Sequence, residues 1–248
     1  MMKSLLANDP TRSALAGRSR RSIERRDVRR PIIVLQGFGC SNRVVLPLER
    51  RLRSALGRST VRLESSSYTF DDIRVSAHAA NGLVEALASR PGFEFVDIVG
   101  HSMGGLVAAY LLKHLDGSRR VRRVVTLGTP YRGTPAAVAG ALLFGFTSRA
   151  IWQMTPGAPL LRELEAAPVP RGSELTSIGA QLDRVVPERR TLLEPSTRQR
   201  NFTIASANHV ELLLSREVST VIAEILSTPL DLDAGRGPSH QGTAPQAA

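Results

Sequence analysis

Short runs of apolar, β-branched residues alternate along the chain with longer segments in which apolar residues recur every three or four positions. The first run, Ile32–Leu35, leads into a glycine-containing loop at residues 37–39, and this pattern predicts a buried strand that ends in a loop. Residues 44–56 have apolar positions at helical spacing, and Gly57 predicts the end of that helix. A strand–helix alternation therefore begins at residue 32.

The same alternation continues to residue 226. Further strands are predicted at residues 61–63, 93–99, 121–127, 175–178 and 202–205. A further helix is predicted from an N-cap at Asp71 or Asp72 to the Pro91-Gly92 pair, with Val75 on its apolar face. Two more helices are predicted over residues 103–115 and 211–226. Strands this apolar are buried on both faces, so the predicted fold class is α/β. We expect a mostly parallel, doubly wound sheet of about six strands with helices on both faces.

Residues 131–172 interrupt this pattern. They are rich in Gly, Ala and Pro, and residues 133–148 carry no charge. Such an apolar insertion after a core strand predicts either a short cap or lid over a pocket or an ordinary pair of packed helices. If the segment covers a pocket, Leu143, Phe146 and Trp152 are candidates for binding an apolar part of a substrate.

The two flanks of the predicted domain, residues 31–229, differ from it in composition. Residues 1–30 are rich in arginine and contribute much of the net charge of +11, while residues 230–248 are rich in Gly, Pro, Ser, Gln and Ala. Both compositions predict disordered segments. A basic arm could bind nucleic acid or an anionic membrane surface, but this arm lacks aromatic residues for base stacking. We therefore expect no nucleic-acid partner and leave contact with a lipid interface open.

Targeting signals are not visible in the sequence. Cys40 is the single cysteine, so an intramolecular disulfide is not possible, which is typical of a reducing compartment and compatible with export. The N-terminal region lacks the apolar stretch of a secretory signal, and no stretch reaches the roughly 18 apolar residues of a membrane span. We expect a soluble, cytoplasmic protein.

The sequence Gly-His-Ser-Met-Gly-Gly at residues 100–105 carries the clearest chemical signal. It lies between an apolar strand and a helix, where a tight turn holds Ser102 in a strained conformation and exposes its hydroxyl. Residues two positions before and after such a serine must be very small, and Gly100, Gly104 and Gly105 meet that demand. The following helix directs its N-terminal N–H groups at an oxyanion formed on attack, so Ser102 is predicted to be a nucleophile.

This motif, the strand and loop at residues 32–39, and the sequence Leu-Gly-Thr-Pro-Tyr-Arg-Gly-Thr-Pro at residues 127–135 together resemble α/β-hydrolase lipases and esterases. The repeated Gly-Thr-Pro is similar to triacylglycerol lipases and related esterase branches. The resemblance covers about residues 31–227 and implies a serine hydrolase of the α/β-hydrolase fold.

A serine nucleophile needs a base, and the base needs an orienting acid, which this fold supplies in the chain order Ser, Asp or Glu, His. Among the five histidines, His209 follows the strand predicted at 202–205, where the family places its base. Asp183 follows the strand at 175–178 and precedes Val-Val-Pro, which is similar to the acid loop of the family. Glu188 is the nearest alternative acid.

The resemblance further implies an oxyanion hole built from the backbone N–H groups of Phe38 and Met103. Two departures concern the same site. Relatives often have His-Gly where this chain has Gln36-Gly37, and many have glycine where it has Asn208. Because the oxyanion donors are backbone groups, the first departure affects how the loop is supported rather than whether the hole exists.

These residues imply hydrolysis of a carboxylic ester through an acyl-enzyme on Ser102, with Asp183 and His209 completing a triad. The apolar segment at 133–154 favours a lipid-like or other small-molecule ester. No metal-ligand pattern, phosphate loop or dinucleotide fingerprint is present, so no metal and no cofactor are expected. Acyl transfer, thioester cleavage and a non-catalytic hydrolase-fold binding protein remain alternatives.

Overall fold

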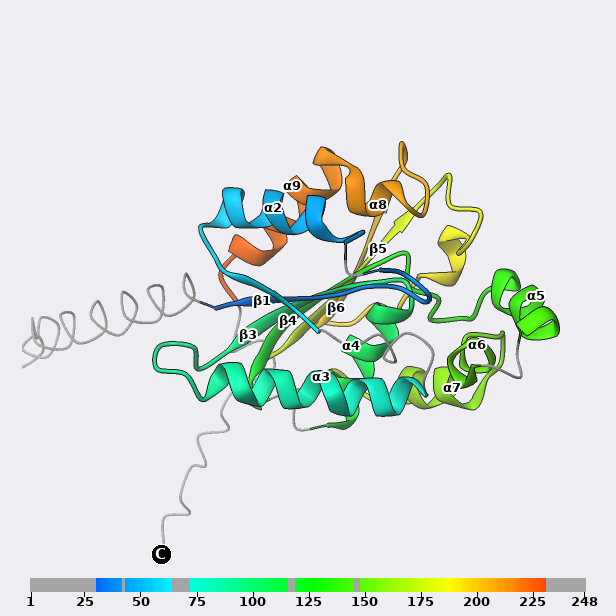
Figure 1. The fold of residues 1–248 in the computed structure, drawn as a ribbon, viewed down its shortest axis with the longest axis horizontal. Helices are drawn as coiled ribbons and strands as arrows, with labels where there is room; N and C mark the ends of the chain where they lie inside the picture. The colour runs from blue at the N-terminus through cyan, green and yellow to red at the C-terminus, as the bar shows by residue number, and fades with distance from the viewer. Residues whose placement is uncertain (1–29, 42, 64–71, 116–118, 145–147, 231–248) are drawn as a thin grey trace, which may run out of the picture.

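The computed structural model describes residues 30–230 apart from 42, 64–71, 116–118 and 145–147, and these residues form a helix-covered sheet (Figure 1). Residues 1–29 of the predicted basic arm and residues 231–248 of the predicted tail lie outside the described residues.

The sheet has six strands in the described part of the chain, all paired in parallel, in the order β2-β1-β3-β4-β5-β6. The strands are β1 (Ile32–Leu35), β2 (Thr60–Arg62), β3 (Val96–His101), β4 (Val121–Leu127), β5 (Glu174–Ala180) and β6 (Gln199–Ile204). The three apolar strands β1, β3 and β4 are almost wholly buried, whereas most residues of edge strand β6 are exposed or half-buried. The predicted fold class is therefore confirmed.

Helices cover both faces of the sheet, as Figure 1 shows above and below the strands. One face carries α2 (Leu46–Leu56), α8 (Glu211–Leu214) and α9 (Arg216–Ser227), which pack on one side of the strands. The other carries α3 (Ile73–Ala88), α4 (Met103–His114) and α7 (Pro159–Ala166), which share the second core cluster. Buried side chains of β1 point alternately into the two clusters, as expected for a strand covered on both faces.

Two helices differ in detail from the sequence pattern. Asp72 caps α3 and accepts a hydrogen bond from the Arg74 backbone N–H at 2.8 Å, but Val75 is 58% exposed, so its predicted place on the apolar face was wrong. The small residues Ala77 and Ala80 face the core instead, which lets α3 pack closely on α4. The predicted last helix is divided at Ser215, whose extended backbone and side-chain hydroxyl start α9.

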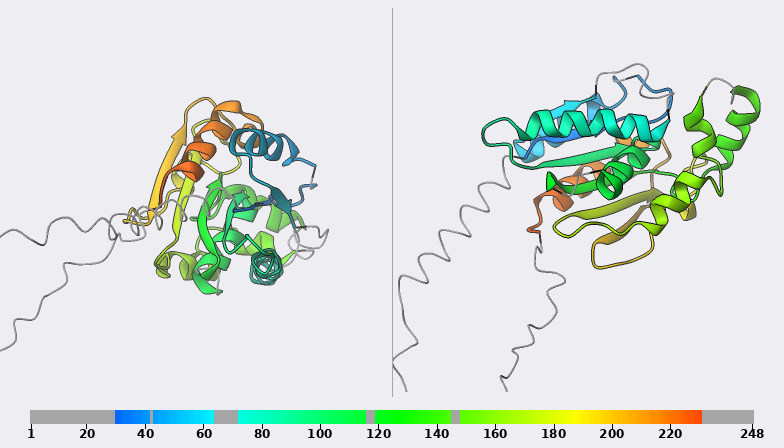
Figure 2. Two further views of the ribbon diagram at one scale, coloured as in Figure 1. Left: turned by 90° about the vertical axis from the view of Figure 1, so that its left-hand side faces the viewer. Right: turned by 90° about the horizontal axis from the view of Figure 1, so that it is seen from below.

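The segment between β4 and β5 contains α5 (Pro135–Phe144), α6 (Arg149–Gln153) and α7. Apolar residues of α6 and α7, including Ile151 and Leu160, are buried. Helix α5 projects from the end of the molecule, as Figure 2 shows from below, and Leu142 on it is 80% exposed. The segment thus combines packed helices with one projecting apolar helix.

The amino end of the sheet holds a buried ion cluster. Asp97 on β3 is fully buried and contacts the guanidinium groups of Arg58 and Arg30, the latter at 3.3 Å. Its other oxygen accepts the backbone N–H of Arg123 at 3.0 Å. Arg30, which the sequence pattern assigned to the basic arm, is therefore part of the folded domain.

Among the described residues, none of the helices has both the length and the apolar composition needed to span a bilayer.

Candidate active site

Ser102 lies on the tight turn between strand β3 and helix α4, at the carboxyl edge of the sheet. Its backbone has φ 54° and ψ −122°, and it is the single non-glycine residue with positive φ in the described part of the chain. Such a conformation costs of order 1–3 kcal/mol and persists where the surrounding fold imposes it. Here β3 and α4 impose it on a serine.

The surrounding glycines explain how the turn is tolerated. A Cβ atom on Gly100 would lie 2.6 Å from the Gly104 carbonyl oxygen, and one on Gly104 would lie 2.5 Å from the carbonyl oxygens of Leu35 and Gln36. A Cβ on Gly105 would overlap the Thr129 hydroxyl. Each glycine therefore permits a backbone approach that a side chain would prevent.

Asp183 and His209 form a close pair at the same edge. Asp183 follows β5, and its Oδ1 accepts hydrogen bonds from the backbone N–H groups of Val185 and Val186 at 2.8 and 2.7 Å. Its Oδ2 lies 2.6 Å from Nδ1 of His209, which follows β6. A neutral imidazole that donates from Nδ1 to a carboxylate has its lone pair on Nε2, the form that can accept a proton.

Ser102, Asp183 and His209 follow three different strands and lie at the same edge of the sheet. The Ser102 backbone N–H donates to the Leu127 carbonyl at 2.8 Å, immediately before Gly128. A Cβ on Gly128 would lie 3.0 Å from His209 Nδ1 and 3.2 Å from Asp183 Oδ2. Gly128, with φ 55°, thus joins the serine turn to the Asp183–His209 pair.

The loop after β1 lies against Ser102. A Cβ on Gly37 would be 3.0 Å from Cβ of Ser102, so glycine permits this approach. Gln36 is buried, Phe38 is half-buried and Met103 is fully buried at the start of α4. The backbone N–H groups of Phe38 and Met103 remain predictions for the oxyanion donors.

Asn208, one of the two departures, has a local structural role. Its side-chain oxygen accepts hydrogen bonds from the backbone N–H groups of Val210 and Glu211 at 3.1 and 3.0 Å. Its own backbone N–H donates to the Glu211 carboxylate at 2.8 Å. These reciprocal bonds have the form of a capping box and fix the turn that carries His209 into α8.

His101 is a site residue that the sequence reasoning set aside because it precedes the serine. Its side chain is buried, its ring centroid lies 4.6 Å from that of His209, and its Nε2 lies 3.0 Å from the His209 carbonyl oxygen. Burial, and secondly the nearby His209, lower the pKa of His101 from its usual 6.5 to about 3. No local sequence signal indicates this contact, because its partners are 108 positions apart.

The candidate substrate-binding residues are only partly described. Trp152, on α6, is 53% exposed and lies at the surface. Leu143 belongs to α5, but its side chain and all of Phe146 lie outside the described residues. Within the described ranges, no group of three or more His, Cys, Asp or Glu side chains is arranged to hold a metal ion.

The fold resembles those of several solved structures. Lipase B of Aspergillus fumigatus matches with a TM-score of 0.67 at 16% identity, over 85% of this chain and 57% of the lipase. The lipase BlEst2 of Bacillus licheniformis in its propeptide form gives 0.66 at 17% identity, over 82% of this chain and 51% of that lipase. The product of the gene lin2722 from Listeria innocua gives 0.62 at 17% identity, over 82% and 96% of the two chains.

These likenesses establish the α/β-hydrolase fold, in agreement with the sequence resemblance. This chain spans little more than half the length of the two lipases. Residues 77–222, more than half of the chain, match the PGAP1-like alpha/beta domain family, and this range includes Ser102, Asp183 and His209. The chain therefore belongs to the PGAP1-like alpha/beta domain family.

Proposed function

We propose that this protein is a serine hydrolase that cleaves carboxylic esters through an acyl-enzyme on Ser102. One observation carries the proposal: a serine in a strained turn lies at the same sheet edge as a histidine whose Nδ1 is 2.6 Å from a buried carboxylate. A carboxylate that fixes the tautomer of a histidine beside a serine is the arrangement that activates a hydroxyl nucleophile. The lipases of the same fold agree with this chemistry.

In the proposed reaction, His209 Nε2 takes the proton of the Ser102 hydroxyl as Oγ bonds to the ester carbonyl carbon. The negative charge that develops on the carbonyl oxygen is stabilised by the N–H groups of Met103 and Phe38 and by the N-terminus of α4. His209 then gives its proton to the departing alkoxide, which leaves as an alcohol. Water, deprotonated by His209, then attacks the acyl-enzyme, and His209 returns that proton to Ser102 Oγ as the bond to the serine breaks and the carboxylic acid is released.

Asp183 keeps the imidazolium of His209 paired during both steps. Its Oδ1 is held by two backbone N–H groups, so Oδ2 is fixed in the direction of Nδ1. An oriented, buried carboxylate stabilises the positive charge on the ring without rearranging at the moment of reaction.

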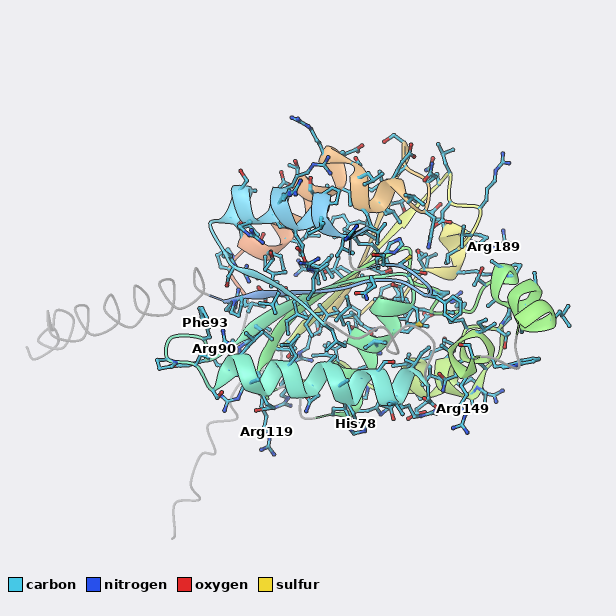
Figure 3. The ribbon with its side chains drawn as sticks, viewed as in Figure 1. His78, Arg90, Phe93, Arg119, Arg149 and Arg189 are labelled. Carbon is cyan, nitrogen blue, oxygen red and sulfur yellow. The ribbon has the colours of Figure 1, made fainter. Side chains whose placement is uncertain are left out.

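We further propose a lipid-like ester presented at an anionic lipid surface, with α5 as the contacting element. Helix α5 contains no charged residue, and Leu142 and Val138 on it are 80% and 41% exposed. No Asp or Glu occurs in residues 117–162. Figure 3 shows Arg149 and Arg189 at the same end of the molecule. An apolar helix with neighbouring arginines is complementary to acyl chains below anionic headgroups.

The chemistry is tested by labelling and hydrolysis with Ser102→Ala. We expect the unmodified chain to hydrolyse short p-nitrophenyl esters and to be labelled by a fluorophosphonate at Ser102, and the variant to do neither. Ser219→Ala, at a buried serine of α9 outside the site, is the matched control and keeps both properties. Hydrolysis by Ser102→Ala at the unmodified rate contradicts the proposal, and product formed from an added alcohol instead of water assigns acyl transfer.

The lipid surface is tested by sedimentation with vesicles of phosphatidylglycerol and phosphatidylcholine. Leu142→Glu is expected to weaken binding about tenfold, because burying a leucine side chain is worth about 1.5–3 kcal/mol. Val75→Glu is the matched control, since Val75 is 58% exposed on α3. Equal binding by both variants contradicts a role for α5.

A further inference from the structure

We infer that His101 is a positioning residue: its imidazole holds the backbone and ring of His209 in place beside Ser102. The inference deepens the proposed function and rests on it, because it concerns the residue proposed as the base. It assigns a role to the residue that directly precedes the serine in Gly-His-Ser-Met-Gly.

The first contact is a hydrogen bond to the loop that carries the base. His101 is the last residue of β3, and its Nε2 lies 3.0 Å from the carbonyl oxygen of His209. A carbonyl oxygen only accepts, so Nε2 of His101 carries the proton in this contact. Because β3 is a central strand paired on both sides, the donor is attached to one of the most firmly held parts of the fold.

The second contact is between the two rings. Their centroids are 4.6 Å apart and their planes are inclined by 49°. Asp183 holds one atom of the His209 ring, Nδ1, and a single hydrogen bond leaves the ring free to pivot about that atom. The His101 ring limits that pivot, while its hydrogen bond fixes the backbone from which the His209 side chain starts.

Nδ1 of His101, on the other side of the ring, lies close to the loop after β1. A Cβ on Gly37 would lie 3.1 Å from Nδ1 of His101 and 3.0 Å from Cβ of Ser102. Nδ1 is buried and has no hydrogen-bond partner among the described residues. The imidazole therefore fills the space between the loop after β1 and the loop after β6, and it sets their separation.

The charge state of His101 suits this role. Burial keeps its pKa at about 3, so the ring is neutral near neutral pH. A neutral ring donates to the His209 carbonyl without placing a second positive charge beside the imidazolium that forms on His209 during the proposed reaction. A cationic side chain at this position would oppose that imidazolium.

The test compares three substitutions at residue 101 in the full chain. The amide nitrogen of His101→Gln reaches as far as Nε2 of histidine and can donate to the His209 carbonyl, whereas that of His101→Asn stops near the position of Nδ1. His101→Leu provides no donor. We expect kcat for a short p-nitrophenyl ester to fall about 10- to 100-fold in the Asn and Leu variants, because a misplaced base slows the chemical step. We expect KM to stay unchanged and His101→Gln to recover most of kcat.

A second measurement distinguishes positioning of His209 from a merely structural role of His101. The proton between His209 Nδ1 and Asp183 gives a far-downfield NMR signal when the pair is held close and shielded from water. This signal is expected in the unmodified chain and in His101→Gln, and it is expected to broaden through exchange in the Asn and Leu variants. If His101→Leu does not fold, the Gln and Asn variants still make the comparison.

The inference is overturned if the Gln and Asn variants have equal kcat and equal NMR signals, or if His101→Leu matches the unmodified chain in both. Failure of the proposed function is a different result: the unmodified chain is then neither active nor labelled at Ser102. In that case the NMR comparison alone decides whether His101 positions His209.

Discussion

The two ends of strand β3 lie in very different environments. Near its amino end it carries Asp97, which is fully buried, and at its carboxyl end it leads through His101 into Ser102. Both ends bury ionisable groups only a few residues apart on one strand. They differ in the partners of those groups, which are ion pairs and hydrogen bonds among several arginines at the amino end and a strained serine turn at the carboxyl end.

At the amino end the buried groups form an extensive network. Asp97 contacts Arg30, Arg58 and the backbone N–H of Arg123. Arg58 also donates to the carbonyl of Arg30, and Arg123 donates to carbonyls at the end of α9. Removing one member of such a network leaves other buried charges without a partner, so its removal is expected to destabilise the fold.

At the carboxyl end the fold retains strain and an unsatisfied group. Ser102 has a positive φ, and Nδ1 of His101 is buried without a hydrogen-bond partner in the described part of the chain. Such features persist where the rest of the fold over-determines them, and they concentrate at reactive sites. Strand β3 thus separates a structural ion network from the proposed chemistry along its length.

The most severe loss of activity is expected at the carboxyl end. Asp183→Asn keeps an oxygen for the N–H groups of Val185 and Val186, but its amide favours the wrong tautomer of His209. We expect kcat for a short ester to fall about 10⁴-fold with little change in thermal stability, as measured by steady-state kinetics and thermal unfolding. A decrease in kcat of less than tenfold contradicts the assignment of the chemistry to the carboxyl end, because Asp183 would then contribute no more than an ordinary structural residue.

At the amino end the expected effects are reversed. Asp97→Asn leaves Arg30 and Arg58 without their carboxylate, and we expect the free energy of unfolding in urea to fall by about 3–5 kcal/mol. The activity of each folded molecule stays unchanged. Glu163→Gln is the control, because this carboxylate pairs with Arg74 at a partly exposed position and is expected to cost at most about 1 kcal/mol. Equal costs for the two variants contradict the comparison.

The smallest effect is on the pH dependence of stability. His101 has a pKa of about 3 in the folded chain and about 6.5 when unfolded, so the unfolded state binds an extra proton below pH 6.5. Its contribution to stability is therefore complete above pH 6.5 and is lost as the pH falls toward 3. As the pH falls, we expect the free energy of unfolding in urea to decrease more steeply for the unmodified chain than for His101→Gln. The difference in slope is at most about 1.4 kcal/mol per pH unit. Parallel pH profiles would show that His101 does not titrate in this way.

Sequence reasoning predicted the parts of the fold whose cause is local. The runs of β-branched residues predict the central strands, and the three glycines predict the turn at Ser102, because both depend on neighbouring residues. Chain order and resemblance placed Asp183 and His209 as candidates, and the structure brings their side chains within 2.6 Å.

The contacts that the sequence did not predict join distant residues. His101 meets the His209 backbone across 108 positions, and Arg30, just before β1, meets Asp97 on β3. The exposed position of Val75 depends on which face of α3 fits α4, and small alanines decide that packing. These outcomes follow from the three-dimensional arrangement, which a periodic pattern does not contain.

The arginines at the amino end also bear on how the chain is made. Arg58 donates to the carbonyl of Leu226, and Arg123 donates to those of Leu226 and Thr228, which leave the ribosome long after the arginines themselves. Until then, two cations destined for the interior lack part of their hydrogen bonding. We expect the domain to become resistant to proteases only after the last helix has left the ribosome and its carbonyls have paired with these arginines.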